Sequence, residues 1–354
     1  MLRVLVVDDS AVFRRLLTHV IDSDKDLTVV GQAADGVEAL ELANRLRPDV
    51  ITMDMHMPRM NGLEATRRIM QEAPRPIVII SASVDPRDVA DSFQSIDAGA
   101  VALLAKPPSP VDPGFGAAIQ QIVKTLKLMS EVKVVKRRGR PEPRLAPVTP
   151  SEVSSTAGGI DVIAIGTSTG GPAALAQVLG ALPSNLPAPI AIVQHIAEGF
   201  DVGLARWLNA VSPLNVVIAA DGMKPGAGDV VIAPSGKHLG LTRRGVVLSD
   251  GEPLDGHLPS VTHMFSTVAR SFGSRALGVV LTGMGGDGAR GLVELKRAGG
   301  RVLAQDESSS IVFGMARKAV ELGAVDRVLP LDDIPAAIVK ICSGSVAPVP
   351  DSKV

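Results

Sequence analysis

Residues 160–172 read IDVIAIGTSTGGP, and this stretch decides the fold of the second half of the chain. An apolar run is followed by small and glycine residues, and a helical pattern then extends from Ala173 to Leu179. This order predicts a strand, a tight turn and a helix, the repeating step of a parallel α/β sheet. Ser168 is therefore expected at the carboxyl end of a strand, where open parallel sheets form their ligand sites.

The same alternation continues on both sides of this turn. After it come APIAIVQ, NVVIAA, DVVIAP, RALGVVLTG, RVLAQ and DRVLP, which predict a larger, mostly parallel, Rossmann-like sheet. Before it, five apolar runs predict a five-stranded parallel, flavodoxin-like sheet. These runs are Val4 to Val7, Val29 to Gly31, Val50 to Met53, Ile77 to Ile80 and Val101 to Leu104. The fold class is thus α/β, with two doubly wound domains.

A chain of 354 residues is too long for one ordinary core, so two domains are expected. We assign residues 1–125 to the first, 126–158 to a flexible, basic and proline-rich linker, 159–345 to the second, and 346–354 to a tail. The linker contains KRRGRP at 136–141, which resembles the core of a minor-groove AT-hook. A DNA-binding response regulator is therefore one alternative, although no helix-turn-helix follows this run.

Composition narrows the possible classes of protein. The formal net charge of -1 gives no overall attraction to nucleic acid or to an anionic membrane. Cys342 is the only cysteine, which excludes an intramolecular disulfide and a thiolate metal cluster and fits a reducing cytoplasm. We expect no signal peptide and no membrane insertion, because the chain shows neither a basic leader nor an apolar run of about 18 residues.

Charged and hydroxyl residues follow the strands of the first domain at one edge of the predicted sheet. Three carboxylates held together raise one another's pKa unless a divalent cation binds, and oxygen ligands suit Mg²⁺. One carboxylate would then attack phosphorus, with Mg²⁺ and a lysine offsetting the developing negative charge. The residues are Asp8, Asp9, Asp54, Ser81 and Lys106.

A simpler reading is that these acids only cap helices, as Asp9 and Ser10 would before a helix that begins near Val12. Capping accounts neither for Lys106 nor for the segment MDMHMPRMNG. Together, VVDDS, MDMHMPRMNGLE, the hydroxyl of Ser81 and GAVALLAKP resemble the response-regulator receiver family over essentially all of the first domain.

The resemblance implies that Asp54 is the phosphoacceptor and that a histidine kinase is the phosphoryl donor. It further implies that Asp8 and Asp9 hold the metal ion together with Asp54, and that Ser81 and Lys106 bind the phosphoryl group.

In the second domain, the turn at Ser168 suits a nucleophile because the glycines beside it permit a sharp bend and the helix amino terminus favours an anion. A phosphate or dinucleotide loop would look similar. A dinucleotide site, however, would have an acidic residue about 20 positions on, and here the next strand ends in Gln194 and His195. An imidazole at this edge could take the serine proton.

A glycine-rich loop, GMGGDG at 283–288, follows the strand ALGVVLTG and carries Asp287, which could orient His195. Ser168, His195 and Asp287 then form a candidate triad, in a chain order different from that of α/β-hydrolases. The backbone N–H groups of Thr169 and Met284 are the candidate oxyanion donors.

Two other histidines of the second domain are candidates for the base. His238 and His257 follow loop-like glycine or proline segments and are rivals, whereas His19 and His56 belong to the first domain. Position at the strand edge favours His195.

The segments IGTSTGG, VQHIAEGF, IAPSGKHL, LTGMGGDGARGL and AQDESSSIVFGM resemble the chemotaxis protein-glutamate methylesterase family. With the receiver, this resemblance covers nearly the whole chain. It implies that the nucleophile is Ser168, the base His195, the orienting acid Asp287 and an oxyanion donor Met284.

Some positions depart from these families. Asn61 stands where receivers often have Asp, and Leu103 replaces the usual aromatic switch residue. In the second domain, Leu258 and Thr262 stand where Arg and Asp are common, and Ala316 replaces Pro. The first pair bears on coupling to phosphorylation, and the others bear on receptor preference.

The expected activity is hydrolysis of γ-glutamyl methyl esters on methyl-accepting chemotaxis receptors, with release of methanol and without a cofactor. The resemblance also implies deamidation of receptor glutamines by the same acyl chemistry. Phosphorylation would activate the enzyme if the unphosphorylated receiver covers the catalytic sheet edge. A non-enzymatic, phosphorylation-dependent adaptor is the second alternative, and the triad disfavours it.

Overall fold

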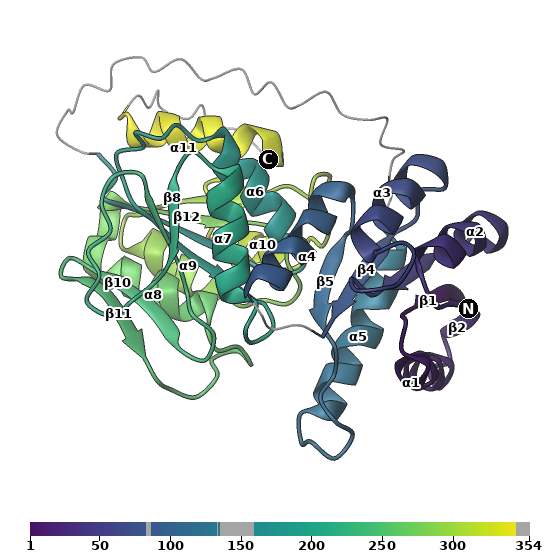
Figure 1. Ribbon diagram of the computed structural model, residues 1–354. Helices are drawn as coiled ribbons and strands as arrows, with labels where there is room; N and C mark the ends of the chain where they lie inside the picture. The colour runs from purple at the N-terminus through teal and green to yellow at the C-terminus, as the bar shows by residue number, and fades with distance from the viewer. Residues whose placement is uncertain (83–85, 133, 135–158, 345–354) are drawn as a thin grey trace. The chain divides into compact units, whose positions relative to one another are not determined.

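The structure is a computed structural model that describes residues 1–82, 86–132, 134 and 159–344. It divides into two compact units, residues 1–144 and 145–354 (Figure 1). The basic run at 136–141 and the predicted tail lie outside the described residues. The exact domain and linker boundaries therefore remain predictions.

The first unit contains a five-stranded parallel sheet with the order β2-β1-β3-β4-β5, which confirms the predicted flavodoxin-like sheet. Every strand overlaps a predicted apolar run. Strands β3 and β4 are buried along their whole length, as the central strands of a parallel sheet are, whereas β2 at the edge of the sheet is mostly half-buried. The strands are β1 Leu2–Val7, β2 Leu27–Ala33, β3 Val50–Met53, β4 Ile77–Ser81 and β5 Ala102–Ala105.

Five helices connect and cover this sheet: α1 Ala11–Asp22, α2 Gly36–Leu46, α3 Gly62–Glu72, α4 Pro86–Ala98 and α5 Phe115–Ser130. Helices α2, α3 and α4 pack in succession, whereas α1 packs against α5, as right-handed crossovers require. Polar side chains fix where several helices begin: Ser10 accepts from the N–H of Phe13, and Asp35 accepts from two N–H groups of α2. Helix α5 continues past the predicted domain boundary at residue 125, because Leu126 and Met129 are fully buried.

The second unit is built on a seven-stranded parallel sheet with the order β14-β13-β12-β6-β7-β9-β8. All seven strands coincide with runs predicted from the sequence. They are β6 Val162–Thr167, β7 Ile190–Gln194, β8 Asn215–Ile218, β9 Asp229–Ile232, β12 Ala276–Val280, β13 Arg301–Gln305 and β14 Arg327–Leu329. The chain leaves β6 toward β7 and later returns to β12 on its other side, so β6 and β12 form the topological switch point.

Helices α6 Gly171–Ala181, α7 Asp201–Val211 and α11 Ile334–Cys342 form one group, in which α6 contacts both other helices. Helices α8 Val261–Phe272, α9 Ala289–Arg297 and α10 Met315–Glu321 form the other. An antiparallel hairpin, β10 His238–Thr242 and β11 Gly245–Ser249, packs on α8 outside the main sheet. The sequence did not predict this hairpin.

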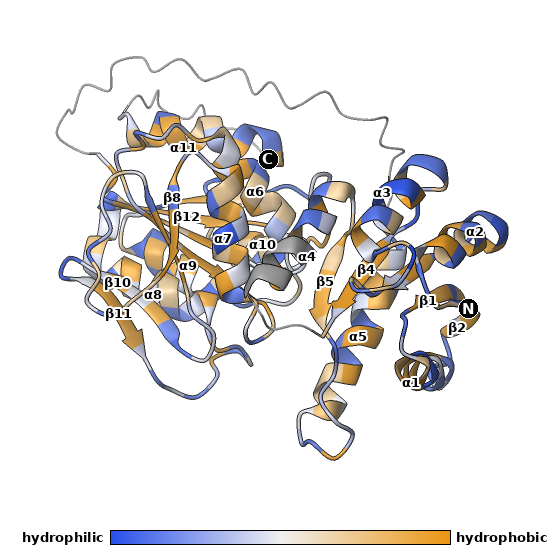
Figure 2. Cartoon of the chain, viewed as in Figure 1, coloured by the Kyte–Doolittle hydropathy of each residue, from blue (hydrophilic) through white to orange (hydrophobic). Residues whose placement is uncertain are grey.

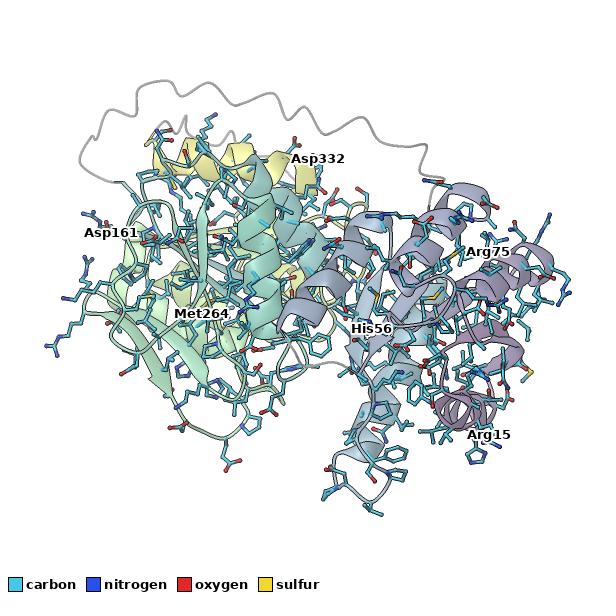
Figure 3. All side chains as sticks on the ribbon, viewed as in Figure 1. Arg15, His56, Arg75, Asp161, Met264 and Asp332 are labelled. Atoms are coloured by element: carbon cyan, nitrogen blue, oxygen red, sulfur yellow. The ribbon has the colours of Figure 1, made fainter. Side chains whose placement is uncertain are left out.

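Both sheets are apolar and their helices are amphipathic (Figure 2). In the second unit, Met264 of α8 is fully buried, whereas Asp161 and Asp332 lie at the periphery (Figure 3). Asp161 pairs there with Arg243 and Arg275. No helix in the described part of the chain combines the length and the apolar character needed to cross a bilayer.

Candidate active site

Ser168 lies on the turn that joins β6 to α6, as the sequence predicted. Gly170 adopts a left-handed conformation with φ of 79° at the start of α6, a backbone angle that L-residues with side chains rarely adopt. The N–H of Gly171 donates to the Ser168 carbonyl at 2.9 Å. The turn is therefore sharp, and it places Ser168 before the amino terminus of an 11-residue helix.

Thr282, just after β12, fixes this turn from the neighbouring strand. Its carbonyl accepts from the Ser168 N–H at 3.1 Å and from Thr167 Oγ1 at 2.9 Å. Its own hydroxyl donates to the Thr169 carbonyl at 2.9 Å. The serine turn and the glycine-rich loop after β12 are thus joined by direct hydrogen bonds at the switch point.

Gln194 ties the serine turn to the candidate base on the other neighbouring strand. Its buried side-chain amide donates to the carbonyls of Ser168 and of His195, both at 2.8 Å. The N–H of His195 donates in turn to the Thr167 carbonyl at 3.1 Å. The structure therefore brings Ser168 and His195 to adjacent strand ends.

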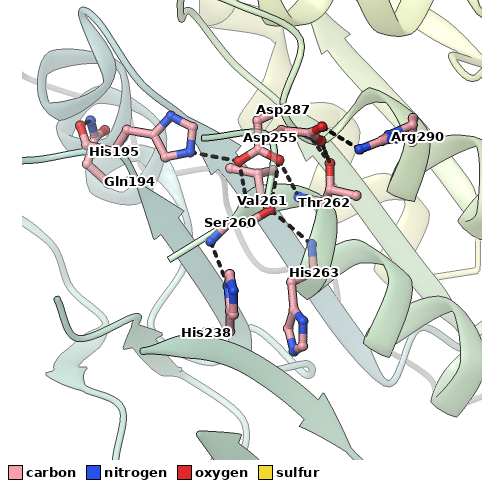
Figure 4. Close-up of polar contacts among 11 residues, drawn as sticks. Gln194, His195, His238, Asp255, Ser260, Val261, Thr262, His263, Asp287 and Arg290 are labelled. Carbon is pink, nitrogen blue, oxygen red and sulfur yellow. Dashed lines mark hydrogen bonds and ion pairs between the residues drawn. The ribbon is translucent and has the colours of Figure 1, made fainter. Parts of the chain in front are cut away.

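His195 is held by Asp287, as the sequence predicted (Figure 4). Its Nε2 lies 2.8 Å from Asp287 Oδ2. Its Nδ1 is buried and has no hydrogen-bond partner among the described residues. When Nε2 carries the ring proton, it donates a hydrogen bond to Asp287. Nδ1 then has a free lone pair, as a general base requires. No side-chain hydrogen bond joins Ser168 to His195 within the described part of the chain, and Gln194 links their two backbone carbonyls.

Asp287 is fixed by the amino terminus of α8, a role that the sequence analysis missed. Oδ1 accepts from Ser260 Oγ at 2.9 Å and from the Thr262 N–H at 2.8 Å, and Oδ2 accepts from the Val261 N–H at 2.7 Å. Burial raises the pKa of Asp287, but the hydrogen bonds from His195 and Thr262 outweigh it and hold the pKa well below its usual range. The carboxylate is therefore charged when His195 takes up a proton.

Two glycines allow α8 to approach so closely. A β-carbon on Gly166 would lie 2.1 Å from Cγ1 of Val261, and one on Gly288 would lie 2.6 Å from the same atom. Neither position has room for a side chain. The sequence did contain a signal for this contact, because Ser260 precedes an apolar helical pattern as an N-cap residue does.

The two candidate oxyanion donors lie in the loops joined by Thr282. A β-carbon on Gly283 would lie only 2.8 Å from Cβ of Ser168, so the residue before Met284 lies against the candidate nucleophile. Among the described residues, neither the Met284 N–H nor the Thr169 N–H donates a hydrogen bond. Both are free to bind an oxygen, which fits the predicted role.

The rival histidines have other environments. His238 Nδ1 accepts from the Ser260 N–H at 3.1 Å, and its Nε2 lies 3.1 Å from the Glu252 carbonyl. Both ring nitrogens of His238 therefore hold the backbone before α8. His257 lies flat against His195, with ring centroids 3.7 Å apart.

Three positions that depart from the expected pattern surround the site. Thr262 Oγ1 accepts from the Gly288 N–H at 2.7 Å and lies 3.1 Å from Asp255 Oδ2, so threonine supports the Asp287 loop here. Leu258 is half-buried. Ala316 is fully buried in the first turn of α10.

The first unit brings its predicted residues together at the carboxyl ends of β1, β3 and β5. Lys106 Nζ lies 2.6 Å from Asp8 Oδ2 and 3.3 Å from Asp54 Oδ2. Carboxylate oxygens of Asp8, Asp9 and Asp54 all lie within 4.8 Å of one another. An acidic cluster able to hold a metal ion is therefore present, with one lysine beside it.

Asp54 is almost fully buried, and its surroundings disfavour the charged form of its carboxyl group. Burial raises its pKa, and the nearby carboxylate of Asp8 raises it further, while Lys106 and the Met55 N–H act in the opposite direction. Ser81 Oγ at the end of β4 is buried and has no hydrogen-bond partner among the described residues. Asn61, which stands where receivers often have Asp, caps α3 by accepting from the Glu64 N–H at 2.9 Å.

The two sites define a class of protein: a unit with a lysine-bridged acidic cluster, joined to an α/β unit with a serine turn beside a His–Asp pair. Comparison with known proteins identifies the family. Residues 4–112 match the model of the response regulator receiver domain, and residues 163–338 match that of CheB methylesterase.

Individual relatives agree with these matches. The chain is 48% identical to "Protein-glutamate methylesterase/protein-glutamine glutaminase 4" of Myxococcus xanthus, over 97% of this chain and 98% of the relative. It is 49% identical to a protein of the same name, numbered 2, of Anaeromyxobacter dehalogenans, over 95% and 96%. The CheB methylesterase catalytic domain of Thermotoga maritima is similar in structure, with 38% identity and a TM-score of 0.50 over 52% of this chain and 99% of that domain. The chain belongs to the CheB methylesterase family, which disfavours the adaptor and DNA-binding alternatives.

Proposed function

We propose that this protein hydrolyses γ-glutamyl methyl esters on methyl-accepting chemotaxis receptors. Ser168 Oγ attacks the ester carbonyl carbon, and its proton passes to His195 Nδ1. The proton then leaves with the methoxy group as methanol, and water hydrolyses the acyl-enzyme to glutamate. The observation that carries this proposal is the His195 ring, held by Asp287 through Nε2 while Nδ1 has no partner among the described residues.

The same residues support deamidation of receptor glutamines. A glutamine carbonyl passes through the same tetrahedral intermediate, and the proton on His195 leaves with the amino group as ammonia. In both reactions the carbonyl oxygen gains negative charge, which the N–H groups of Met284 and Thr169 would stabilise. Neither reaction uses a cofactor in this scheme.

The first unit is proposed to control this activity through phosphorylation of Asp54 by a chemotaxis histidine kinase. Asp8, Asp9 and Asp54 offer the clustered carboxylate oxygens that Mg²⁺ prefers, and the bound ion would neutralise charge on the incoming phosphoryl group. Lys106 would bind a phosphoryl oxygen, because its Nζ already lies between Asp8 and Asp54. The unpartnered Ser81 hydroxyl would donate to another oxygen.

Phosphorylation adds about -1.5 to -2 charge at a buried site, which is enough to change how a phosphoacceptor unit packs. We place the protein in the cytoplasm, where a kinase that draws on ATP works. Its partners are then the kinase and the receptors, with no membrane insertion and no nucleic acid in its function.

The test uses methylated receptor membranes and the full chain. Methanol release and conversion of receptor glutamine to glutamate are both measured, the second by peptide mass spectrometry. The Ser168→Ala variant should lose both activities, whereas Ser343→Ala at the end of α11 should keep both. If Ser168→Ala loses methanol release but keeps deamidation, deamidation uses other residues. If Ser168→Ala still releases methanol, Ser168 is not the nucleophile.

A further inference from the structure

A second imidazole lies against the candidate base. The rings of His257 and His195 are stacked, with centroids 3.7 Å apart and an angle of 7° between their planes. The His195 side chain is only 8% exposed. His257 therefore covers one face of the ring that must take up and release a proton.

A short, well-anchored loop holds His257 in this position. Leu254 and His257 exchange two backbone hydrogen bonds of 3.1 Å each. Between them, Asp255 and Gly256 have φ of 54° and 80°, the left-handed pair that a two-residue hairpin turn uses. The Asp255 carboxylate pairs with Arg290 of α9. Such a loop is built to present one side chain rather than to move freely.

We propose that His257 is a positioning residue for His195 and that it must be neutral during turnover. This inference rests on the proposed function. A neutral imidazole keeps the His195 ring oriented with Nε2 on Asp287, and its π-face favours the imidazolium that forms when Ser168 loses its proton. A proton on His257 would place a second positive charge against that imidazolium and oppose it.

Other charged groups near His257 are mixed in sign. His257 lines a cavity of about 480 Å³. One acid in this cavity, Asp287, is already held by His195 and by the amino terminus of α8. In the proposed reaction, the group beside His257 whose charge changes is the stacked ring of His195. The ionisable residues that line the cavity with His257 are Asp255, Asp287, Arg290, Arg317, Lys318 and Glu321.

The test is the pH profile of kcat/KM for methanol release from methylated receptor membranes, for the wild type and His257→Phe. Phenylalanine keeps a flat ring and cannot be protonated. In the wild type, two interacting imidazoles must both be neutral, so the slope of log kcat/KM should steepen toward 2 at low pH. In His257→Phe it should stay at about 1, with activity within about threefold of wild type near pH 8.

Two further variants sharpen this test. His257→Ala should lower kcat about 10- to 100-fold at pH 8, because the His195 ring loses its support. His19→Gln is the control, because it removes an exposed imidazole of the first unit. Its slope of log kcat/KM at low pH should match that of the wild type. An unchanged slope in His257→Phe would overturn the proposal, while Ser168→Ala would still report on the proposed function separately.

A measurement on the wild type covers the case in which the variants fold poorly. The wild-type profile of log kcat/KM should itself steepen toward a slope of 2 at low pH, whatever the variants do. A slope that stays at about 1 over the whole acidic range in which the wild type remains folded would overturn the proposal.

Discussion

Replacement of Asp287 by asparagine should lower turnover far more than it lowers stability. His195 Nε2 lies 2.8 Å from Asp287 Oδ2. At that separation, with an effective dielectric constant of about 20, the carboxylate stabilises the imidazolium by at most roughly 6 kcal/mol. The amide dipole of asparagine recovers part of this. We therefore expect kcat to fall about 10³- to 10⁴-fold, equivalent to about 4 to 5.5 kcal/mol.

The cost to folding follows from the same contacts. Oδ1 faces the Thr262 N–H and Oδ2 faces the Val261 N–H, so either orientation of the amide turns its NH₂ group toward one backbone donor. One unpaired buried N–H costs about 1 to 3 kcal/mol. The free energy of unfolding of the second unit should decrease by about that amount in denaturant titrations.

The assay is single-turnover methanol release together with denaturant unfolding. Asp201→Asn is the matched control, because Asp201 is also buried and accepts from the Ser235 N–H at 2.8 Å. It should leave kcat near the wild-type value. A kcat for Asp287→Asn within tenfold of the wild type would refute the assignment of Asp287 as the acid that supports His195.

Three further outcomes follow from the contacts described above. Asp54→Asn should raise the melting temperature of the first unit at pH 7, because the raised pKa of Asp54 means that its charged form disfavours folding. This gain in melting temperature should be present above the pKa of Asp54 in the folded protein and should vanish as pH falls below 3.8. Calorimetry that showed the opposite trend with pH would contradict the idea that the charge of Asp54 disfavours folding. Gln194→Leu should lower kcat about tenfold or more and leave the phosphorylation of Asp54 unchanged, because the carbonyls of Ser168 and His195 lose their shared donor. Normal methanol release by this variant would show that the amide does not position the site. Burial raises the pKa of Cys342 to about 12, so the native protein should not react with a disulfide reagent at pH 8 but should react fully on denaturation; rapid labelling of the folded chain would argue against the packing of α11.

Much of this arrangement could be predicted because parallel sheets align the ends of their strands. Ser168, His195 and Asp287 follow three apolar runs, and the structure places all three runs side by side as β6, β7 and β12. In the first unit, Asp8 and Asp54 likewise follow the neighbouring strands β1 and β3, and Lys106 follows β5 at the same edge of the sheet, with β4 between β3 and β5. In both units, hydrophobic periodicity determined the strands, and the strands determined which polar residues meet.

The contacts that the sequence did not predict come from elements with weak local signals. The hairpin of β10 and β11 packs on α8 and contributes His238, which accepts from the Ser260 N–H. Nothing in its short runs distinguishes it from another sheet strand. The stacking of His257 on His195 depends on how the loop before α8 folds back, and tertiary packing of this kind has no period in the sequence.

The most direct test of the account measures methanol release from methylated receptor membranes, with and without a small-molecule phosphoryl donor. Wild type, Ser168→Ala and Asp54→Ala are compared in the same preparation. We predict that the donor accelerates release by the wild type, that Asp54→Ala keeps only the basal rate, and that Ser168→Ala releases no methanol under either condition. Release by Ser168→Ala, or equal acceleration of the wild type and Asp54→Ala, would contradict a serine hydrolase controlled by phosphorylation of Asp54.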